Sequence, residues 1–121
     1  KFRQSLKGIL LGRFPLMEVE EAGNGKEALE RVDVLQPEIV FMDIKLPGES
    51  GLELTKKIKT DYPRLTVIVL TSYNLPEYRQ AAYQCGASYF LTKDASPEEL
   101  VQLVQLILSK RGSDTNAQGR D

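Results

Sequence analysis

Three residues of this chain have side chains suited to phosphoryl chemistry, and each follows a run typical of a buried strand. They are Asp43, Thr71 and Lys93, which come after residues 39–42, 67–70 and 89–92. Open α/β folds place their chemistry at the carboxyl ends of parallel strands, so we expect these side chains to meet at one edge of a sheet. A carboxylate there can act as a nucleophile toward phosphorus if a cation neutralises the transferring oxygens.

The three side chains have different expected roles. Asp43 is the candidate acceptor and Lys93 is the local cation. At about 4 Å, two unit charges attract by roughly 1 kcal/mol in bulk water and by about 4 kcal/mol at the effective dielectric of a protein surface. The hydroxyl of Thr71 can donate to a phosphoryl oxygen, in a bond worth about 1.5–3 kcal/mol. We therefore expect Thr71 to sense the phosphoryl group rather than to transfer it.

Fast phosphoryl transfer usually also needs Mg²⁺, which prefers several oxygen ligands in near-octahedral geometry. Asp43 alone would bind this ion weakly. Other acidic residues are badly placed, because Glu49 follows a Pro-Gly turn and Glu18 and Glu20 belong to an expected edge strand. The residues of the chain therefore predict a weak metal site.

An alternation of helices and strands must position these residues. Apolar residues at helical spacing predict helices that end near residues 14, 36, 62 and 86, and a last helix that begins at 96–97. Strands are expected between them, at 17–20, 39–42, 66–71 and 88–91. The uninterrupted apolar run 39–42 favours a central strand, whereas the alternation at 17–20 favours an edge strand. The pattern predicts a doubly wound parallel sheet that lacks a strand before its first helix.

One apolar face of each helix is the predicted core. It includes Leu29, Val32 and Leu35 in the second helix, and Ala82 and Cys85, a packed small side chain, in the fourth. The last helix opens with an N-cap residue, Pro and Glu at positions 96, 97 and 99. Residues 112–121 lack periodicity, so we predict a flexible tail or the start of a linker there.

Composition limits the functions open to the chain. Its 121 residues suit one domain, and 16 Lys and Arg against 17 Asp and Glu give a net charge of −1, which attracts neither nucleic acid nor anionic membranes. No apolar run approaches the roughly 18 residues of a membrane span. The absence of His and the single Cys85 exclude imidazole chemistry and an internal disulfide, and they favour a cytoplasmic setting.

The chain resembles the receiver domains of two-component response regulators from residue 2 to residue 110. Residues 43–48 with Gly51 are similar to the phosphoacceptor strand and loop of that family, residues 70–72 to its switch hydroxyl, and residues 86–94 to its fifth strand. The NarL/FixJ (LuxR-like) branch is the most similar, through Lys93-Asp94, Asn24-Gly25 and the motif at 96–100.

The resemblance implies a flavodoxin-like fold, a doubly wound parallel sheet of five strands in the order 2-1-3-4-5, with the first strand missing from this chain. It also implies Mg²⁺ bound by Asp43 and the backbone carbonyl of Lys45, together with an acidic pair that is absent from the chain. We therefore expect residues 1–111 to be a receiver domain without its first strand, with weak or no binding of Mg²⁺.

By the same resemblance, Asp43 accepts a phosphoryl group from a sensor histidine kinase, Lys93 pairs with it, Thr71 moves toward it, and Phe90 is the aromatic residue that changes rotamer. The implied function is a phosphorylation-dependent signalling switch rather than an enzyme. A homodimer is a further expectation, and DNA would be bound only through a helix-turn-helix domain outside this chain, which would regulate transcription.

Two residues lie two positions beyond a site residue. They are Lys45, after Asp43, and Tyr73, after Thr71. We expect them either to tune hydrolysis of the phosphoryl group or to lie in a solvated loop.

Two other functions are open to these residues. A hydrolase of the haloacid dehalogenase kind also uses a strand-end Asp as its phosphoryl acceptor, but it carries a second Asp two residues later, where this chain has Lys45. The other alternative is an interaction module that dimerises without phosphorylation. The cognate kinase, the target genes and the dimer interface are not encoded in any motif of the chain.

Overall fold

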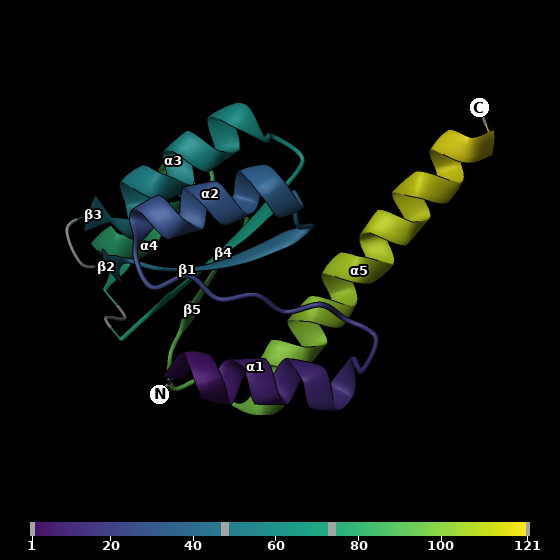
Figure 1. Ribbon diagram of the computed structural model, residues 1–121, viewed down its shortest axis with the longest axis horizontal. Coiled ribbons are helices and arrows are strands. Elements are labelled where there is room, and N and C mark those ends of the chain that lie inside the picture. Colours follow the sequence, from purple (N-terminus) through teal and green to yellow (C-terminus); the bar gives the residue numbers. More distant parts are fainter. Residues whose placement is uncertain (1, 47–48, 73–74, 121) are drawn as a thin grey trace. The chain divides into compact units, whose positions relative to one another are not determined.

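A parallel sheet carries the apolar runs that precede the candidate site residues. The computed structural model describes residues 2–46, 49–72 and 75–120. In these residues β1 (Ile39–Asp43), β4 (Thr66–Thr71) and β5 (Tyr89–Thr92) pair side by side in the order β1-β4-β5, and both pairings are parallel (Figure 1). The parallel α/β architecture predicted from the alternation of elements is confirmed.

The middle strand of this sheet is β4, not the run that begins at Ile39. All but the first residue of β4 are buried, whereas most of β1 is half-buried. The prediction of a central position for residues 39–42 is therefore wrong for the described sheet, because no described strand pairs with the other edge of β1. An apolar run reports that a strand is covered, but it does not report how many neighbours the strand has.

Three helices belong to the same compact unit as the sheet, residues 20–94. They are α2 (Gly25–Leu35), α3 (Gly51–Asp61) and α4 (Pro76–Gln84), and α2 lies beside α3 (Figure 1). Their inner faces and one face of the sheet form a shared apolar core, made of Val32, Met42, Ile44, Leu54, Ile58, Leu65, Val67, Val69, Ala82, Ala87 and Phe90. Leu35, which the periodicity placed in the core, is 47% exposed at the end of α2.

Local signals in the sequence begin and end these helices. The side chain of Asn24 accepts a hydrogen bond from the backbone N–H of Glu27 at the start of α2. Pro76 stands in the first turn of α4, and Gly86 follows that helix with φ of 105°, a left-handed conformation that favours glycine.

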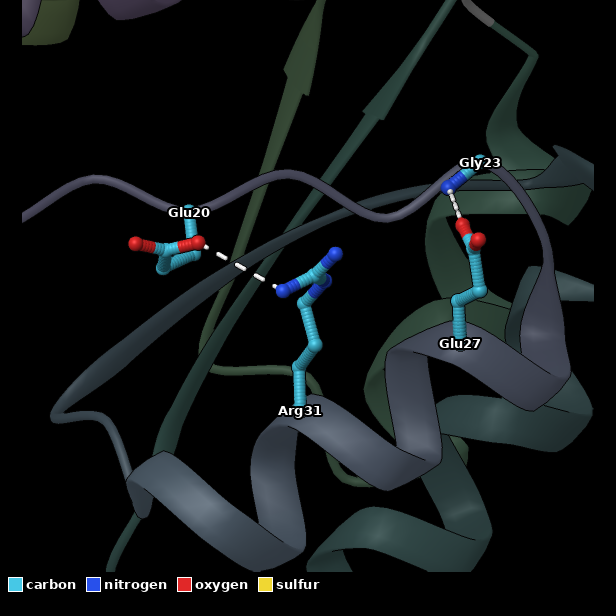
Figure 2. A network of polar contacts seen from close by, with 4 residues as sticks. All are labelled: Glu20, Gly23, Glu27 and Arg31. Carbon is cyan, nitrogen blue, oxygen red and sulfur yellow. Dashed lines mark hydrogen bonds and ion pairs between the residues drawn. The ribbon is translucent and has the colours of Figure 1, made fainter.

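The segment before α2 is held by polar contacts rather than by a strand ladder. The carboxylate of Glu27 accepts from the backbone N–H of Gly23 at 2.7 Å, and Arg31 reaches from α2 to Glu20 at 3.5 Å (Figure 2). The predicted strand at 17–20 does not form. A strand needs a partner for its backbone N–H and C=O groups, and none of the described strands pairs with this segment.

Residues 1–19 and 95–121 form the second compact unit. Its helices are α1 (Phe2–Arg13) and α5 (Pro97–Arg120), which contact one another. The predicted cap of α5 is present, because Ser96 and Glu99 exchange backbone-to-side-chain hydrogen bonds at 3.2 Å. The helix continues to Arg120, so the irregular chain predicted from residue 112 is helical to residue 120; extending an existing helix costs little once its first turns have formed.

None of the helices in the described ranges is both long enough and apolar enough to cross a membrane.

Candidate functional site

Asp43 and Lys93 meet at the carboxyl edge of the sheet. The Nζ atom of Lys93 lies 2.5 Å from Oδ2 of Asp43, and the two side chains are 27% and 30% exposed respectively. Asp43 is the last residue of β1, and Lys93 follows the last residue of β5. The two residues are fifty positions apart in the chain, and the parallel sheet brings them together as expected.

The position of Lys93 is set by β4, the strand that lies between β1 and β5. In the register of the sheet, Thr71 of β4 pairs with Thr92 of β5, and the backbone N–H of Lys93 donates to the carbonyl oxygen of Thr71 at 2.8 Å. The hydroxyl of Thr92 donates to the carboxylate of Asp94 on the far side of Lys93. These bonds fix the backbone at Lys93, so that its side chain reaches back across the end of β4 to Asp43.

The loop after Asp43 is held closely against the strand end. The backbone N–H of Lys45 donates to Oδ1 of Asp43 at 3.1 Å, and the backbone N–H of Gly51 donates to the carbonyl of Ile44 at 2.8 Å. Between them, β2 (Lys45–Leu46) and β3 (Glu49–Ser50) pair antiparallel. One carboxylate oxygen of Asp43 therefore accepts a hydrogen bond from a backbone N–H, and the other accepts one from the ammonium of Lys93.

Gly51 is a site residue whose role the sequence did not reveal. A Cβ atom at this position would lie 1.7 Å from the carbonyl oxygen of Asp43, a distance that no packing allows. The side chain of Ser50 caps α3 beside it, accepting from the N–H of Leu52 at 3.2 Å. The Ser50-Gly51 pair signals a turn, but only the tertiary structure shows that the turn lies against the backbone of Asp43.

Thr71 is buried at the end of β4, with 1% of its surface exposed. Side chains alternate along a strand, so Thr71 shares a sheet face with Val69, and the register places Phe90 of β5 opposite Val69. Thr71, Val69 and Phe90 thus lie on one face of the sheet. This is the face of the shared apolar core, to which both Val69 and Phe90 belong.

Phe90 is already buried, with 4% of its surface exposed. The guanidinium of Arg79, on α4, lies over its ring at 4.8 Å from the ring centroid. The part that Arg79 plays was not foreseen, because no pattern in the sequence of α4 indicates which side chain meets β5.

Two further candidates are placed differently. The side chain of Lys45 is exposed beside Asp43, and its tuning role stays a prediction. Tyr73 lies outside the described residues, and so does the Pro47-Gly48 turn of the predicted phosphoacceptor loop.

The described residues do not by themselves fit a protein-built Mg²⁺ site. Within residues 2–46, 49–72 and 75–120 there is no cluster of three acidic, His or Cys side chains that could hold a metal ion. Asp43 contributes one carboxylate, whereas Mg²⁺ prefers six oxygen ligands in octahedral geometry. The site is thus a carboxylate paired with a cation, with a buried hydroxyl-bearing residue one strand away.

Comparisons with known proteins agree with this geometry. The family model of the response regulator receiver domain matches residues 1–105. The transcriptional regulatory protein LnrK of Bacillus subtilis is 36% identical over 107 residues, which are 88% of this chain and 49% of LnrK. The chain spans about half the length of the curated relatives it matches.

Solved structures extend the likeness to the fold. The CheY-like receiver domain protein of Methanospirillum hungatei matches with a TM-score of 0.83 and 28% identity, over 92% of this chain and 87% of that one. A LuxR-family response regulator of Aurantimonas matches with a TM-score of 0.71 and 34% identity, over 76% of this chain and 66% of that one. The flavodoxin-like fold class and the likeness to the LuxR branch are confirmed. Because the family model covers most of the chain and its relatives are response regulators, this chain belongs to the response regulator receiver domain family.

Proposed function

We propose that Asp43 is the phosphoacceptor of a signalling switch and takes its phosphoryl group from a sensor histidine kinase. One observation carries the assignment, the contact of 2.5 Å between Lys93 Nζ and Asp43 Oδ2. An ammonium at this distance can neutralise charge on a phosphoryl group that is bonded to the same carboxylate. Membership of the receiver family supports the kind of reaction.

The transfer forms one bond and breaks one. A carboxylate oxygen of Asp43 attacks the phosphorus of a phosphohistidine, and the P–N bond breaks. Its electron pair returns to the imidazole nitrogen, which then takes a proton from solvent. The product is an acyl phosphate beside the ammonium of Lys93, in a site where the exposed fractions of about a third leave room for the donor to approach.

Thr71 and Phe90 would convert this event into a change of shape. The hydroxyl of Thr71 moves toward the phosphoryl oxygens, and Phe90, on the same sheet face, is stabilised in the inward position that it already occupies in this structure. Driving a two-state equilibrium from 1:99 to 99:1 takes about 5.5 kcal/mol. A hydrogen bond to a charged acceptor contributes about 1.5–3 kcal/mol, and the lysine pair must contribute the rest.

The output of the switch is proposed to be control of transcription through a DNA-binding domain elsewhere in the whole protein. The support is that LnrK is a transcriptional regulatory protein and that the chain corresponds to about half of it. A cytoplasmic setting and a homodimer are proposed with it. A haloacid dehalogenase-like hydrolase is not favoured, because the position two residues past Asp43 is Lys45, whose backbone N–H, not an acid, meets the carboxylate.

The test is to label the chain with acetyl phosphate or a phosphorylated kinase core, with and without added Mg²⁺. Labelling is measured by intact mass and by sensitivity of the label to hydroxylamine, which cleaves acyl phosphates. Asp43→Asn should abolish labelling. Asp61→Asn is the matched control, because Asp61 is an exposed carboxylate at the last residue of α3, the end of that helix opposite Gly51 and the site. It should label as well as the unchanged chain.

Equal labelling of the Asp43→Asn variant would refute the assignment. Phosphatase turnover of small phosphate esters that Asp43→Ala abolishes would show a hydrolase instead.

A further inference from the structure

The ring of Phe90 is covered by a side chain of α4. The guanidinium carbon of Arg79 lies 4.8 Å from the ring centroid. Arg79 is exposed, whereas Phe90 is 4% exposed and belongs to the core. The guanidinium therefore lies between the aromatic ring and solvent.

This contact differs from the other contacts of Phe90. The core around the ring is apolar and attracts it through packing alone. A guanidinium over the ring face adds an electrostatic attraction to the ring quadrupole, and its planar shape stacks on the ring. That attraction exists only while the ring faces α4, so it favours one rotamer over the others.

Arg79 has exposed neighbours on the surface of α4. Arg79 and Tyr83 lie one turn apart on α4, and Leu75 is the N-cap residue that precedes the helix. Leu75 and Tyr83 are large exposed side chains, and Arg79 lies over the ring of Phe90 on β5. A movement of Phe90 away from the core would break this contact and change the surface of α4.

We infer that Arg79 is the positioning residue of the Phe90 switch. It holds Phe90 in the buried rotamer, and so biases the receiver domain toward the state that phosphorylation of Asp43 favours. This inference rests on the proposed function. Arg79 lies on α4 and β5 carries Phe90, so it acts on the switch through Phe90 and not on the phosphoryl group.

The test observes Phe90 directly. The chain contains four Phe residues, so labelling with 4-fluorophenylalanine gives a fluorine NMR spectrum in which the Phe90 signal is assigned by Phe90→Leu. The solvent isotope shift between H₂O and D₂O reports how far the fluorine is exposed. The variants are Arg79→Ala and Arg79→Lys, with Gln80→Ala as the control, an exposed position on the same helix.

We expect Arg79→Ala to lower the ratio of buried to exposed Phe90 by about two- to fivefold, the range of an exposed cation–π contact. Arg79→Lys keeps the charge but not the planar stack, so it should fall between Arg79→Ala and the unchanged chain. Gln80→Ala should leave the Phe90 signal where it is. A Phe90 signal that is the same in all four proteins would overturn the inference.

A second measurement needs no Arg79 variant and so does not depend on such a variant folding. In the unchanged chain, side-chain protons of Arg79 should be shifted upfield by the ring current of Phe90, and Phe90→Leu should remove this shift. Absence of the upfield shift would also overturn the inference.

Failure of the proposed function would look different. Phosphorylation should return the Phe90 signal of Arg79→Ala toward the buried position, because it favours the same rotamer. If the Phe90 signal depends on Arg79 but does not change on phosphorylation, the switch at Asp43 is refuted. Arg79 would still be the residue that positions Phe90.

Discussion

At the scale of single residues, the pair of Asp43 and Lys93 matters for chemistry more than for stability. Both side chains are about a third exposed, and an ion pair in such a setting contributes only about 0–1 kcal/mol to folding because water screens it. The same ammonium meets a phosphoryl group at the moment when negative charge on its oxygens must be offset. The ammonium therefore affects the rate of phosphoryl transfer more than it affects the stability of the fold.

Replacing Lys93 by Met should separate these two effects. We expect labelling of Asp43 to slow by about a hundredfold, the usual cost of losing one charge-stabilising donor. The unfolding free energy should change by about 1 kcal/mol or less, measured by urea denaturation. Lys56→Met, at an exposed position of α3, is the control and should label normally. A Lys93→Met chain that labels at the normal rate would contradict the role of Lys93.

Replacing Thr71 by Val should uncouple the switch from the transfer. Val keeps the shape of the buried side chain and removes its hydroxyl, which should cost about 1–3 kcal/mol of stability if it leaves a buried polar partner unpaired. Labelling of Asp43 should continue, while the fluorine signal of Phe90 should no longer respond to it. Thr71→Ser, which keeps the hydroxyl, should preserve the response. A full response in Thr71→Val would show that the hydroxyl is not the sensor.

At the scale of elements, the start of α3 positions the acceptor. Gly51 is the first residue of α3, and its N–H bonds the carbonyl of Ile44, next to Asp43. The helix itself is anchored by Leu54 and Ile58, which are almost completely buried. A firmly packed helix thus presses its first turn against the backbone of the site, and only a residue without a side chain fits there.

Gly51→Ala tests this arrangement. The added Cβ would lie 1.7 Å from the carbonyl oxygen of Asp43, so the backbone must move, at a cost of about 1–3 kcal/mol in unfolding free energy. The displaced Asp43 should also label more slowly. The control is Gly8→Ala in α1, where nothing lies within 4 Å of an added Cβ; there Ala should stabilise the helix by up to about 1 kcal/mol. Equal behaviour of the two variants would disprove the close contact.

At the scale of the whole molecule, one hydrogen bond gives stability a dependence on alkaline pH. The hydroxyl of Tyr62 donates to Oδ1 of Asp33 at 2.6 Å, joining the end of α3 to α2. This bond to a carboxylate, with smaller contributions from burial and from the charges of Asp33 and Asp61, raises the pKa of Tyr62 above its ordinary value. The neutral phenol is the form that the folded protein favours.

The sign of the effect follows from the raised pKa. The stabilisation is present in full below the pKa of the unfolded chain, about 10, and it is lost as the pH rises through the higher pKa of the folded protein. Unfolding curves measured from neutral to strongly alkaline pH should show this loss in the unchanged chain. Tyr62→Phe should be less stable at neutral pH and should lack this part of the alkaline decline. Parallel curves for both proteins would rule the bond out as the cause.

Much of this molecule was predictable because many of its signals are local. The cap at Ser96 and the stop at Gly86 act within about four residues of their own positions. The apolar periods that mark helices and strands are equally local. The meeting of Asp43 and Lys93 could be predicted too, because both residues come at the carboxyl ends of parallel strands and those ends lie at one edge of the sheet.

The features that escaped prediction all depend on partners distant in the sequence. Residues 17–20 carry a strand pattern but pair with none of the described strands, and β4 is the middle of the sheet because it pairs with both β1 and β5. The contact of Gly51 with Asp43 and the cover that Arg79 forms over Phe90 arise from packing between elements. The sequence by itself determined which groups could do chemistry and which strand ends would carry them. Only the tertiary structure decided what surrounds those groups, because each neighbour is set by how whole elements pack against one another.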